Sequence, residues 1–303
     1  MHTISRLNEI PAVIDRTALH ALGVLVPIQF HPVKVLPGRH PLGRAGEGMR
    51  LLRTRPYVVG EDNPRDIDKF SPRNERMVME WEDEAQASIV LLADTTASMA
   101  PPFKAALRNA CLLQLTYSLW RAGDRVATVF FDNALREQVR AANLRMQLER
   151  LTTSLARPRE TAETDVSAVL QQYLDQGRNR LSDLLFVVSD FVSTDKKVLD
   201  PETEWRPMLN SMHRNIVPVI ISFEMSANLE GVAKLWDAER KTRRLTWFSS
   251  KRIRRINQAE KDRVAALVLR FRAAGLDYMV LSNQHHVYPQ LARLARMRRF
   301  RKQ

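Results

Sequence analysis

The sequence has little of what marks secreted, membrane-spanning or disulfide-stabilised proteins. It contains a single cysteine, Cys111, in 303 residues, so the chain cannot form an internal disulfide or a thiolate metal cluster. Its longest apolar runs, near residues 21–28 and 184–188, fall far short of the roughly 20 residues that a membrane-spanning helix needs. The amino terminus lacks the continuous apolar core and small-residue cleavage site of a secretory signal. We therefore expect a folded cytoplasmic protein in which Cys111 fills a helix core position.

The features of several enzyme classes are also missing. The chain has only 10 glycines and no phosphate-binding loop of the GxxxxGK[ST] type. His213, His285 and His286 do not form a ligand set with a recognisable spacing, so a surface or core position is the better interpretation of each. A metal phosphatase would usually need more carboxylates or histidines around its ion. We expect that the protein is not an enzyme and that any ATP hydrolysis belongs to a partner.

Positive charge, in contrast, is abundant. The chain has 47 Lys and Arg against 34 Asp and Glu, a formal net charge of +13, which attracts nucleic acid, acidic membrane surfaces or acidic proteins. Basic residues gather at 240–255 and in the tail LARLARMRRFRKQ, where arginines could neutralise phosphates. The tail also carries Leu291, Leu294, Met297 and Phe300, as a helix lying on a membrane would. Since aromatic interleaving and a helix-turn-helix signature are absent, nucleic-acid binding ranks below protein binding; a solvated helix face is the other alternative.

Strand and helix patterns alternate from residue 88 onward and predict a doubly wound, mostly parallel α/β sheet. Residues 1–86 form an amino-terminal arm and an extension rich in short strands and turns, while 87–303 form the α/β domain. The proline-rich start predicts an extended arm with a short helix around Asp15 to Leu22. Strands are expected at 88–93, 126–131, 135–139, 184–189, 216–222 and 278–281. Helices are expected at 102–121, 144–151, 166–173, 205–212, 264–271 and 287–297, with residues 223–260 less regular.

Two of the expected strands end in an acidic residue. Strand 88–93 leads into Asp94, Thr96 and Ser98, and strand 184–189 is followed by Asp190. The carboxyl ends of parallel strands meet at one edge of a sheet, and Thr164 lies in a loop that can reach the same edge. Carboxylate and hydroxyl oxygens suit a small hard cation such as Mg²⁺ or Mn²⁺. A helix-capping turn is the structural alternative for the Asp-Thr-Thr loop.

The spacing of these residues resembles the metal-ion-dependent adhesion site of von Willebrand factor A domains. The pattern of that site is D-x-S-x-S, a distant threonine and a distant aspartate, and Thr96 in the second position keeps the hydroxyl. Thr161 is an alternative for the distant threonine, but Asp165 directly after Thr164 favours the latter. The resemblance implies a divalent ion held by five side chains, with the last one direct or through water: Asp94, Thr96, Ser98, Thr164 and Asp190.

The stretch before the first strand resembles the signature of the DUF58 group of bacterial A-domain proteins. It contains Arg-x-Tyr, Gly-Asp, Arg-x-Ile-Asp, Ser-x-Arg and a closing acidic run, with Glu61 inserted in the Gly-Asp pair and Phe70 near the usual tryptophan. Such proteins typically accompany AAA+ ATPases of the MoxR type. The resemblance therefore implies a metal-dependent protein-binding adaptor that helps such an ATPase in the chaperone-like assembly or maturation of client proteins. From the residues themselves, Arg65, Asp68 and Arg73 predict an ion-pair network that braces this segment.

Overall fold

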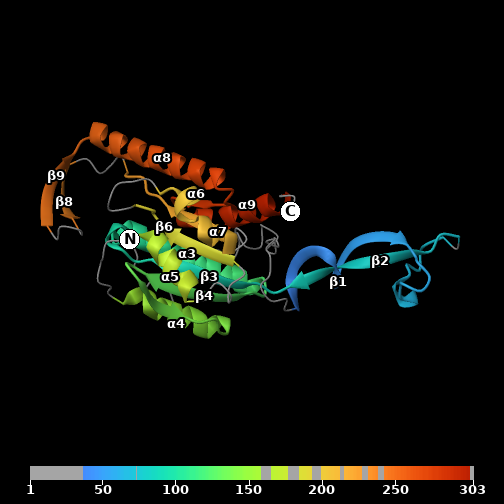
Figure 1. The fold of residues 1–303 in the computed structure, drawn as a ribbon. Helices are drawn as coiled ribbons and strands as arrows, with labels where there is room; N and C mark the ends of the chain where they lie inside the picture. The colour runs from blue at the N-terminus through green and yellow to red at the C-terminus, as the bar shows by residue number, and fades with distance from the viewer. Residues whose placement is uncertain are drawn as a thin grey trace.

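The computed structural model describes residues 37–72, 74–157, 165–176, 184–192, 199–211, 215–226, 231–237 and 242–300. These residues form a six-stranded α/β sheet, a two-stranded ribbon before it and a two-stranded hairpin late in the chain (Figure 1). The helix predicted around Asp15 to Leu22 lies outside the described residues, as do Thr161 and Thr164.

The six-stranded sheet has the order β10-β7-β6-β3-β4-β5. All neighbours are parallel except β4 and β5, so the predicted fold class, a doubly wound and mostly parallel α/β sheet, is confirmed. The strands lie where the apolar runs predicted them: β3 (Ser88–Asp94), β4 (Arg125–Phe131), β5 (Leu135–Val139), β6 (Leu184–Ser189), β7 (Ile216–Ile221) and β10 (Met279–Leu281).

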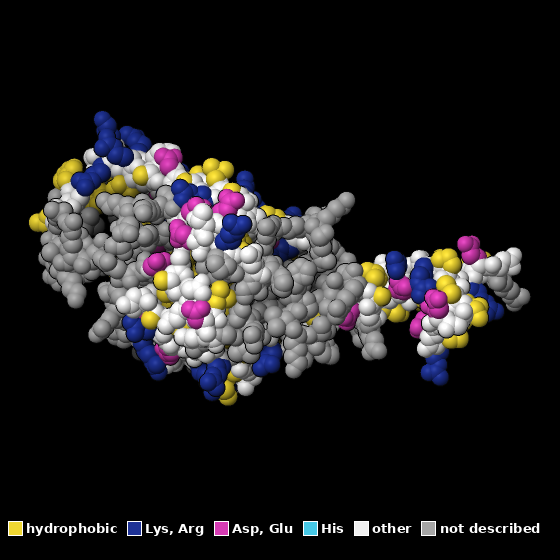
Figure 2. Space-filling model, viewed as in Figure 1, with side chains coloured by type: hydrophobic (Ala, Val, Ile, Leu, Met, Phe, Trp, Pro, Cys, Tyr) yellow, Lys and Arg dark blue, Asp and Glu magenta, His cyan; other side chains and the backbone are white. Residues whose placement is uncertain are grey.

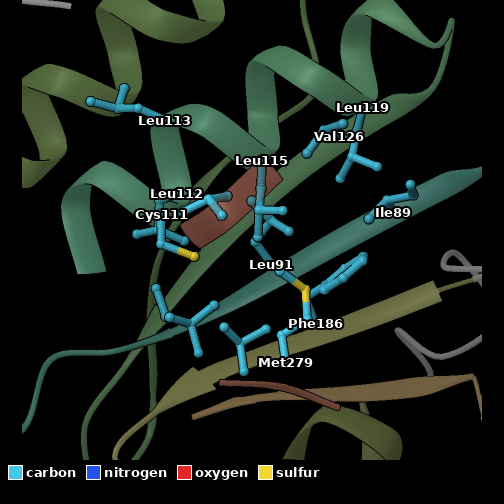
Figure 3. Packing of buried hydrophobic residues seen from close by; sticks show 14 of the residues in the cluster. Ile89, Leu91, Cys111, Leu112, Leu113, Leu115, Leu119, Val126, Phe186 and Met279 are labelled. Atoms are coloured by element: carbon cyan, nitrogen blue, oxygen red, sulfur yellow. The ribbon is translucent and has the colours of Figure 1, made fainter. Parts of the chain in front are cut away.

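Helices cover both faces of this sheet. One face packs against α3 (Pro102–Arg121), α4 (Leu144–Ala156) and α9 (Val287–Phe300). The other packs against α5 (Val166–Asp175), α7 (Arg206–Ser211) and α8 (Ser250–Ala273), and the short α6 (Pro201–Glu204) contacts α7 and α8. Successive residues of a strand point to opposite faces, so Leu91 joins the first core and Leu92 the second. Figure 3 shows the first core, where Leu112 and Leu115 of α3 lie over Leu91 and Phe186 of the sheet.

The prediction of irregular structure over residues 223–260 was wrong. Strands β8 (Gly231–Asp237) and β9 (Thr242–Phe248) pair as an antiparallel hairpin, and α8 begins at Ser250, far ahead of the helix predicted from residue 264. The first turns of α8 are rich in lysine and arginine, and Ile253 is their buried apolar residue. They therefore lack the apolar periodicity from which a helix is predicted.

The apolar face of the closing helix is used inside the protein. Leu294 of α9 is buried, and Leu291 and Met297 pack against the same cluster. The adjacent Arg298 is also buried and forms an ion pair with Asp277 at 3.1 Å. This face is therefore not available for a membrane surface as the tail sequence suggested. Among the described residues, no helix combines the length and apolar character needed to cross a membrane.

The amino-terminal ribbon consists of β1 (Pro37–Pro56) and β2 (Met77–Ala85), which pair antiparallel and extend away from the sheet (Figure 1). The connection between them contains a turn at residues 59–61 and a short 3-10 helix, η2 (Pro64–Asp66). In the close pairing of the two strands, a side chain at Gly46 would overlap Asp83, which explains the glycine at this position.

The ion pairs of the ribbon differ from the predicted ones. Arg55 donates to both carboxylate oxygens of Asp62 at 2.7 and 2.5 Å and to Glu80 at 2.5 Å, and Arg53 donates to Glu80 at 2.6 Å. These hydrogen bonds from Arg55 hold the pKa of Asp62 and Glu80 below the usual range. The cluster thus ties the connection between the strands to the paired end of β1 and β2, and Glu61 leaves the pairing of Arg55 with Asp62 intact.

The residues expected to form that network have other contacts. Asp68 accepts from the backbone N–H of Phe70 at 3.0 Å, and the backbone N–H of Arg65 donates to Asn63 at 3.0 Å. Arg73 lies outside the described residues. The predicted bracing network is therefore replaced, in the described part of the chain, by one internal to the ribbon.

Candidate metal site

The candidate site lies where the order of strand addition reverses in the sheet. From β3 the chain proceeds to β4 and β5 on one side, and it later returns to β6 on the other side of β3. The carboxyl ends of β3 and β6 therefore flank the topological switch point, where open α/β sheets bind their ligands. Asp94 is the last residue of β3, and Asp190 directly follows β6. The predicted convergence of the two acids follows from this strand order.

Hydrogen bonds connect the predicted ligands into one cluster. Asp94 Oδ1 accepts from the backbone N–H of Thr96 at 2.8 Å, and Asp94 Oδ2 accepts from Ser189 Oγ at 2.5 Å. The hydroxyl oxygens of Thr96 and Ser98 are 3.2 Å apart. Ser98 Oγ then donates to Asp190 Oδ1 at 3.0 Å. The structure thus brings together the four predicted ligands that it describes, and the fifth, Thr164, lies outside the described residues.

The two carboxylates are deeply buried. Asp94 is 2% exposed and Asp190 is 0% exposed. Burial, and after it the charge of Asp190, raise the pKa of Asp94 to about 6, although hydrogen bonds from Ser189 and Thr96 act in the opposite direction. The charged form of Asp94 is therefore penalised in the folded chain, and a cation between the carboxylates would relieve that penalty.

Two basic residues complete the site, and the sequence analysis missed both. Lys104 Nζ donates to Asp190 Oδ2 at 2.6 Å, with both side chains buried. Arg108 Nη1 donates to the main-chain oxygen of Asp94 at 2.9 Å. The two cations are four residues apart on α3 and therefore lie on the same side of the helix.

The buried face of α3 includes a lysine. Phe103 is 43% exposed, whereas the next residue, Lys104, is buried. Lys104 and Arg108 share a helical spacing with Cys111 and Leu115, which are fully buried. This spacing could have shown from the sequence that Lys104 is buried. A buried lysine needs a carboxylate partner, which would have pointed to the acids of the site.

The backbone after β6 fixes the second carboxylate. Phe191 adopts a positive φ of 54°, which costs a residue with a side chain roughly 1–2 kcal/mol. Its ring packs against Phe271 with centroids 5.3 Å apart, and its backbone N–H donates to Ser189 Oγ at 2.9 Å. Arg263 of α8 donates to the main-chain oxygen of Asp190. These contacts hold the strained turn and with it the position of the Asp190 side chain.

The donor set fits a hard divalent ion. Asp94 and Asp190 supply carboxylate oxygens and Thr96 and Ser98 supply hydroxyls, which is the ligand chemistry of Mg²⁺ and Mn²⁺. Within the described residues, no group of three or more Asp, Glu, His and Cys side chains is placed to hold a metal, so an ion here would depend on two carboxylates and on the hydroxyls. Lys104 opposes the ion, because its ammonium group already neutralises part of the charge on Asp190.

The strand order defines a doubly wound α/β protein, with acidic and hydroxyl side chains at its switch point. Residues 53–266 match the family described as "Protein of unknown function DUF58", and the chain belongs to this family, as its signature predicted. No curated protein matches the sequence.

Three solved structures match about 70% of the chain. One is an aerotolerance-related membrane protein from Bacteroides fragilis NCTC 9343 with multiple mutations to serines, at 10% identity and a TM-score of 0.44, covering 70% of this chain and 99% of that chain. The conserved hypothetical protein BatB from Bacteroides thetaiotaomicron is 13% identical with a TM-score of 0.35, covering 69% and 99%. Proximal thread matrix protein 1 from the mussel byssus is 12% identical with a TM-score of 0.38, covering 69% and 46%.

Proposed function

We propose that this protein is a metal-dependent adaptor that binds other proteins at the carboxyl edge of its six-stranded sheet. The observation that carries the proposal is the hydrogen-bonded convergence of Asp94, Thr96, Ser98 and Asp190 at the switch point. A bound Mg²⁺ or Mn²⁺ would supply an open coordination position for a carboxylate of the partner. Thr164 would be the remaining ligand, as the adhesion-site pattern implies.

Binding suits this site better than hydrolysis. Asp190 accepts hydrogen bonds from Ser98 and Val192 at one oxygen and from Lys104 at the other. Both oxygens of Asp94 are likewise engaged. A general base needs a carboxylate that is within reach of a proton to be removed, and these two are occupied in holding the site together. We therefore propose a protein without enzymatic activity of its own.

The proposed partner is an AAA+ ATPase of the MoxR type, which would hydrolyse ATP while this protein selects or positions client proteins in the cytoplasm of a bacterium. Membership of the DUF58 family supports this pairing, since the resemblance to that group is what implies an ATPase of this type as the partner. A site with a carboxylate-accepting metal offers a reversible means of contact with an acidic side chain of the ATPase or client.

A capture experiment tests the proposal. The full chain is immobilised, incubated with native bacterial lysate in Mg²⁺ or in EDTA, and the bound proteins are identified by mass spectrometry. We expect an AAA+ ATPase with Mg²⁺, none with EDTA, and none with Asp94→Asn. The matched control is Asp132→Asn, because Asp132 lies just after β4 at the same edge but pairs with Arg136 at 2.7 Å. Equal recovery in Mg²⁺ and EDTA would refute the metal-dependent contact, and absence of any ATPase would refute the partner.

A further inference from the structure

A cationic surface lies at the start of α8, in a part of the chain that the metal site does not use. Its four exposed side chains are Lys251, Arg252, Arg254 and Arg255. At about 100° per residue they cover an arc of about 160° of the helix, and the buried Ile253 lies opposite the middle of that arc. The four cations therefore share one solvent-facing side of the helix.

This placement is unfavourable for the isolated chain. The amino-terminal end of a helix carries a positive partial charge, which repels cations. The first turn of α8 has no acidic residue, and none of the ion pairs found among the described residues involves Lys251, Arg254 or Arg255. These cations are therefore available to an anionic partner, whose charge would also offset the repulsion from the helix end.

Two large apolar side chains lie beside the cations. Leu245 and Trp247 are 75% and 63% exposed, and their spacing of two residues places them on the same face of β9. Strand β9 pairs only with β8 in the described part of the chain, so this face belongs to a two-stranded hairpin at one end of the molecule (Figure 1). An exposed leucine and tryptophan next to a row of cations mark an interaction surface.

The apolar and cationic parts are held together at a fixed corner. Ser249, the single residue between β9 and α8, caps the helix by accepting from the backbone N–H of Arg252 at 3.3 Å. The Arg252 guanidinium also lies 5.6 Å from the ring centre of Phe248 and donates to the main-chain oxygen of Trp247 at 3.3 Å. Figure 2 shows dark-blue and yellow side chains gathered at the upper left, where β9 meets α8 in Figure 1. We call this surface the basic–apolar corner: Leu245, Trp247, Lys251, Arg252, Arg254 and Arg255.

We propose that the basic–apolar corner binds anionic lipid surfaces. Tryptophan is favoured at the headgroup level of a membrane, and a neighbouring leucine can enter the acyl boundary. The cations would contact anionic headgroups, each contributing to the attraction. Leu245 has no aromatic face for stacking on bases, so the pair of apolar side chains fits lipid better than single-stranded nucleic acid. This inference is independent of the metal site and of the proposed ATPase partner.

The test is co-sedimentation of the full chain with vesicles of phosphatidylcholine alone or with about 30% phosphatidylserine. We expect binding to the anionic vesicles only, and weakening by salt. Replacing three cations, Lys251→Gln, Arg254→Gln and Arg255→Gln, should weaken binding about fivefold per charge, or about a hundredfold together. Replacing the apolar pair, Leu245→Ser and Trp247→Ser, should weaken it on the order of tenfold. All of these side chains are exposed, so the thermal midpoint should stay the same.

Two control variants remove the same chemistry elsewhere. Arg140→Gln, Arg293→Gln and Arg296→Gln remove three exposed cations outside the corner, and Val59→Ser with Phe70→Ser removes two exposed apolar side chains of the ribbon connection. Both controls should bind the anionic vesicles almost as well as the unaltered chain. Equal losses in the controls, or no vesicle binding at all, would overturn the proposal. Corner-dependent binding of a labelled single-stranded DNA that vesicles do not displace would also overturn it and assign the surface to nucleic acid.

Discussion

Two charged clusters of this protein each combine two basic and two acidic residues, but they differ in burial and in the direction of the pKa shifts. The ribbon cluster joins Arg53 and Arg55 to Asp62 and Glu80, and the site cluster joins Lys104 and Arg108 to the acidic ends of β3 and β6. In the ribbon cluster the two arginines are partly exposed, with Arg53 at 65% and Arg55 at 32%, so water screens their charge, whereas the carboxylates of Asp62 and Glu80 are largely covered by them. In the site cluster, burial removes that screening, and each charge depends on its partner.

The pKa shifts of the two clusters point in opposite directions. Hydrogen bonds from Arg55 lower the pKa of Asp62 and of Glu80, so the ionised forms of both carboxyls are satisfied. The pKa of Asp94 is instead raised to about 6, first by burial and then by Asp190. A carboxylate whose ionised form is destabilised by the fold is typical of a binding site, while one whose ionised form is stabilised by hydrogen bonds is typical of a structural ion pair.

The largest expected effect comes from removing the buried cation. Lys104→Met leaves the fully buried Asp190 without its counter-charge, and breaking such a pair costs about 3–5 kcal/mol of unfolding free energy. Urea denaturation in EDTA measures this loss. The same variant should respond more strongly to Mg²⁺, because the ammonium group no longer competes for Asp190. Lys261→Met is the control, since Lys261 and Glu224 are both more than 60% exposed; a loss as small as in this control would contradict burial as the cause.

Metal addition should produce the next effect. At about 100 times its dissociation constant, Mg²⁺ would raise the unfolding free energy by roughly 2.7 kcal/mol, and EDTA would reverse the change. Thermal denaturation over a series of Mg²⁺ concentrations measures it. Asp132→Asn should retain the response and Asp94→Asn should lose it. If the thermal midpoint of the unaltered protein stayed the same at saturating Mg²⁺, the cluster would be a structural hydrogen-bond network that binds no metal.

Asp94→Asn should stabilise the metal-free chain. A pKa raised from 3.8 to about 6 means that the folded chain binds this proton more tightly than the unfolded chain. The metal-free protein should therefore lose stability as pH rises from about 4 to about 6, and asparagine should remove that dependence. The difference between the two pKa values corresponds to about 3 kcal/mol, and the loss of the hydrogen bond from Ser189 offsets about 1 kcal/mol of it. We therefore expect a gain of about 2 kcal/mol at neutral pH in EDTA, measured by urea denaturation at several pH values. A destabilised variant would show that the hydrogen bonds from Thr96 and Ser189 outweigh the buried charge.

The smallest effect is expected in the ribbon. Arg55→Gln removes the hydrogen bonds to Asp62 and Glu80, but water can solvate both carboxylates. We expect no resolvable change in the thermal midpoint of the α/β sheet and an unaltered response to Mg²⁺. Limited proteolysis would report any local loosening of the ribbon. A large shift in the midpoint would show that the ribbon and the sheet unfold together through this cluster.

The sheet and the acids of the site could be predicted from the sequence, but the role of the two cations could not. Strands β3 and β6 were predictable because buried parallel strands are continuous apolar runs, and the acids that follow them lie at a known edge. Lys104 could not be assigned from α3 alone, since its partner Asp190 is 86 residues away. The strand β9 of the hairpin before α8 was missed because Leu245 and Trp247 face solvent and gave no core pattern.

The single cysteine can report how often the helix beside the site opens. Cys111 lies on α3 three residues beyond Arg108, and its side chain is fully enclosed by the core of Figure 3. Burial raises the pKa of its thiol, so the folded protein offers thiol reagents neither access nor a reactive thiolate. Alkylation can then occur only when α3 leaves the sheet, and its rate in native buffer reports how often that helix opens. The helix that carries both cations of the site can thus be timed without engineering a label.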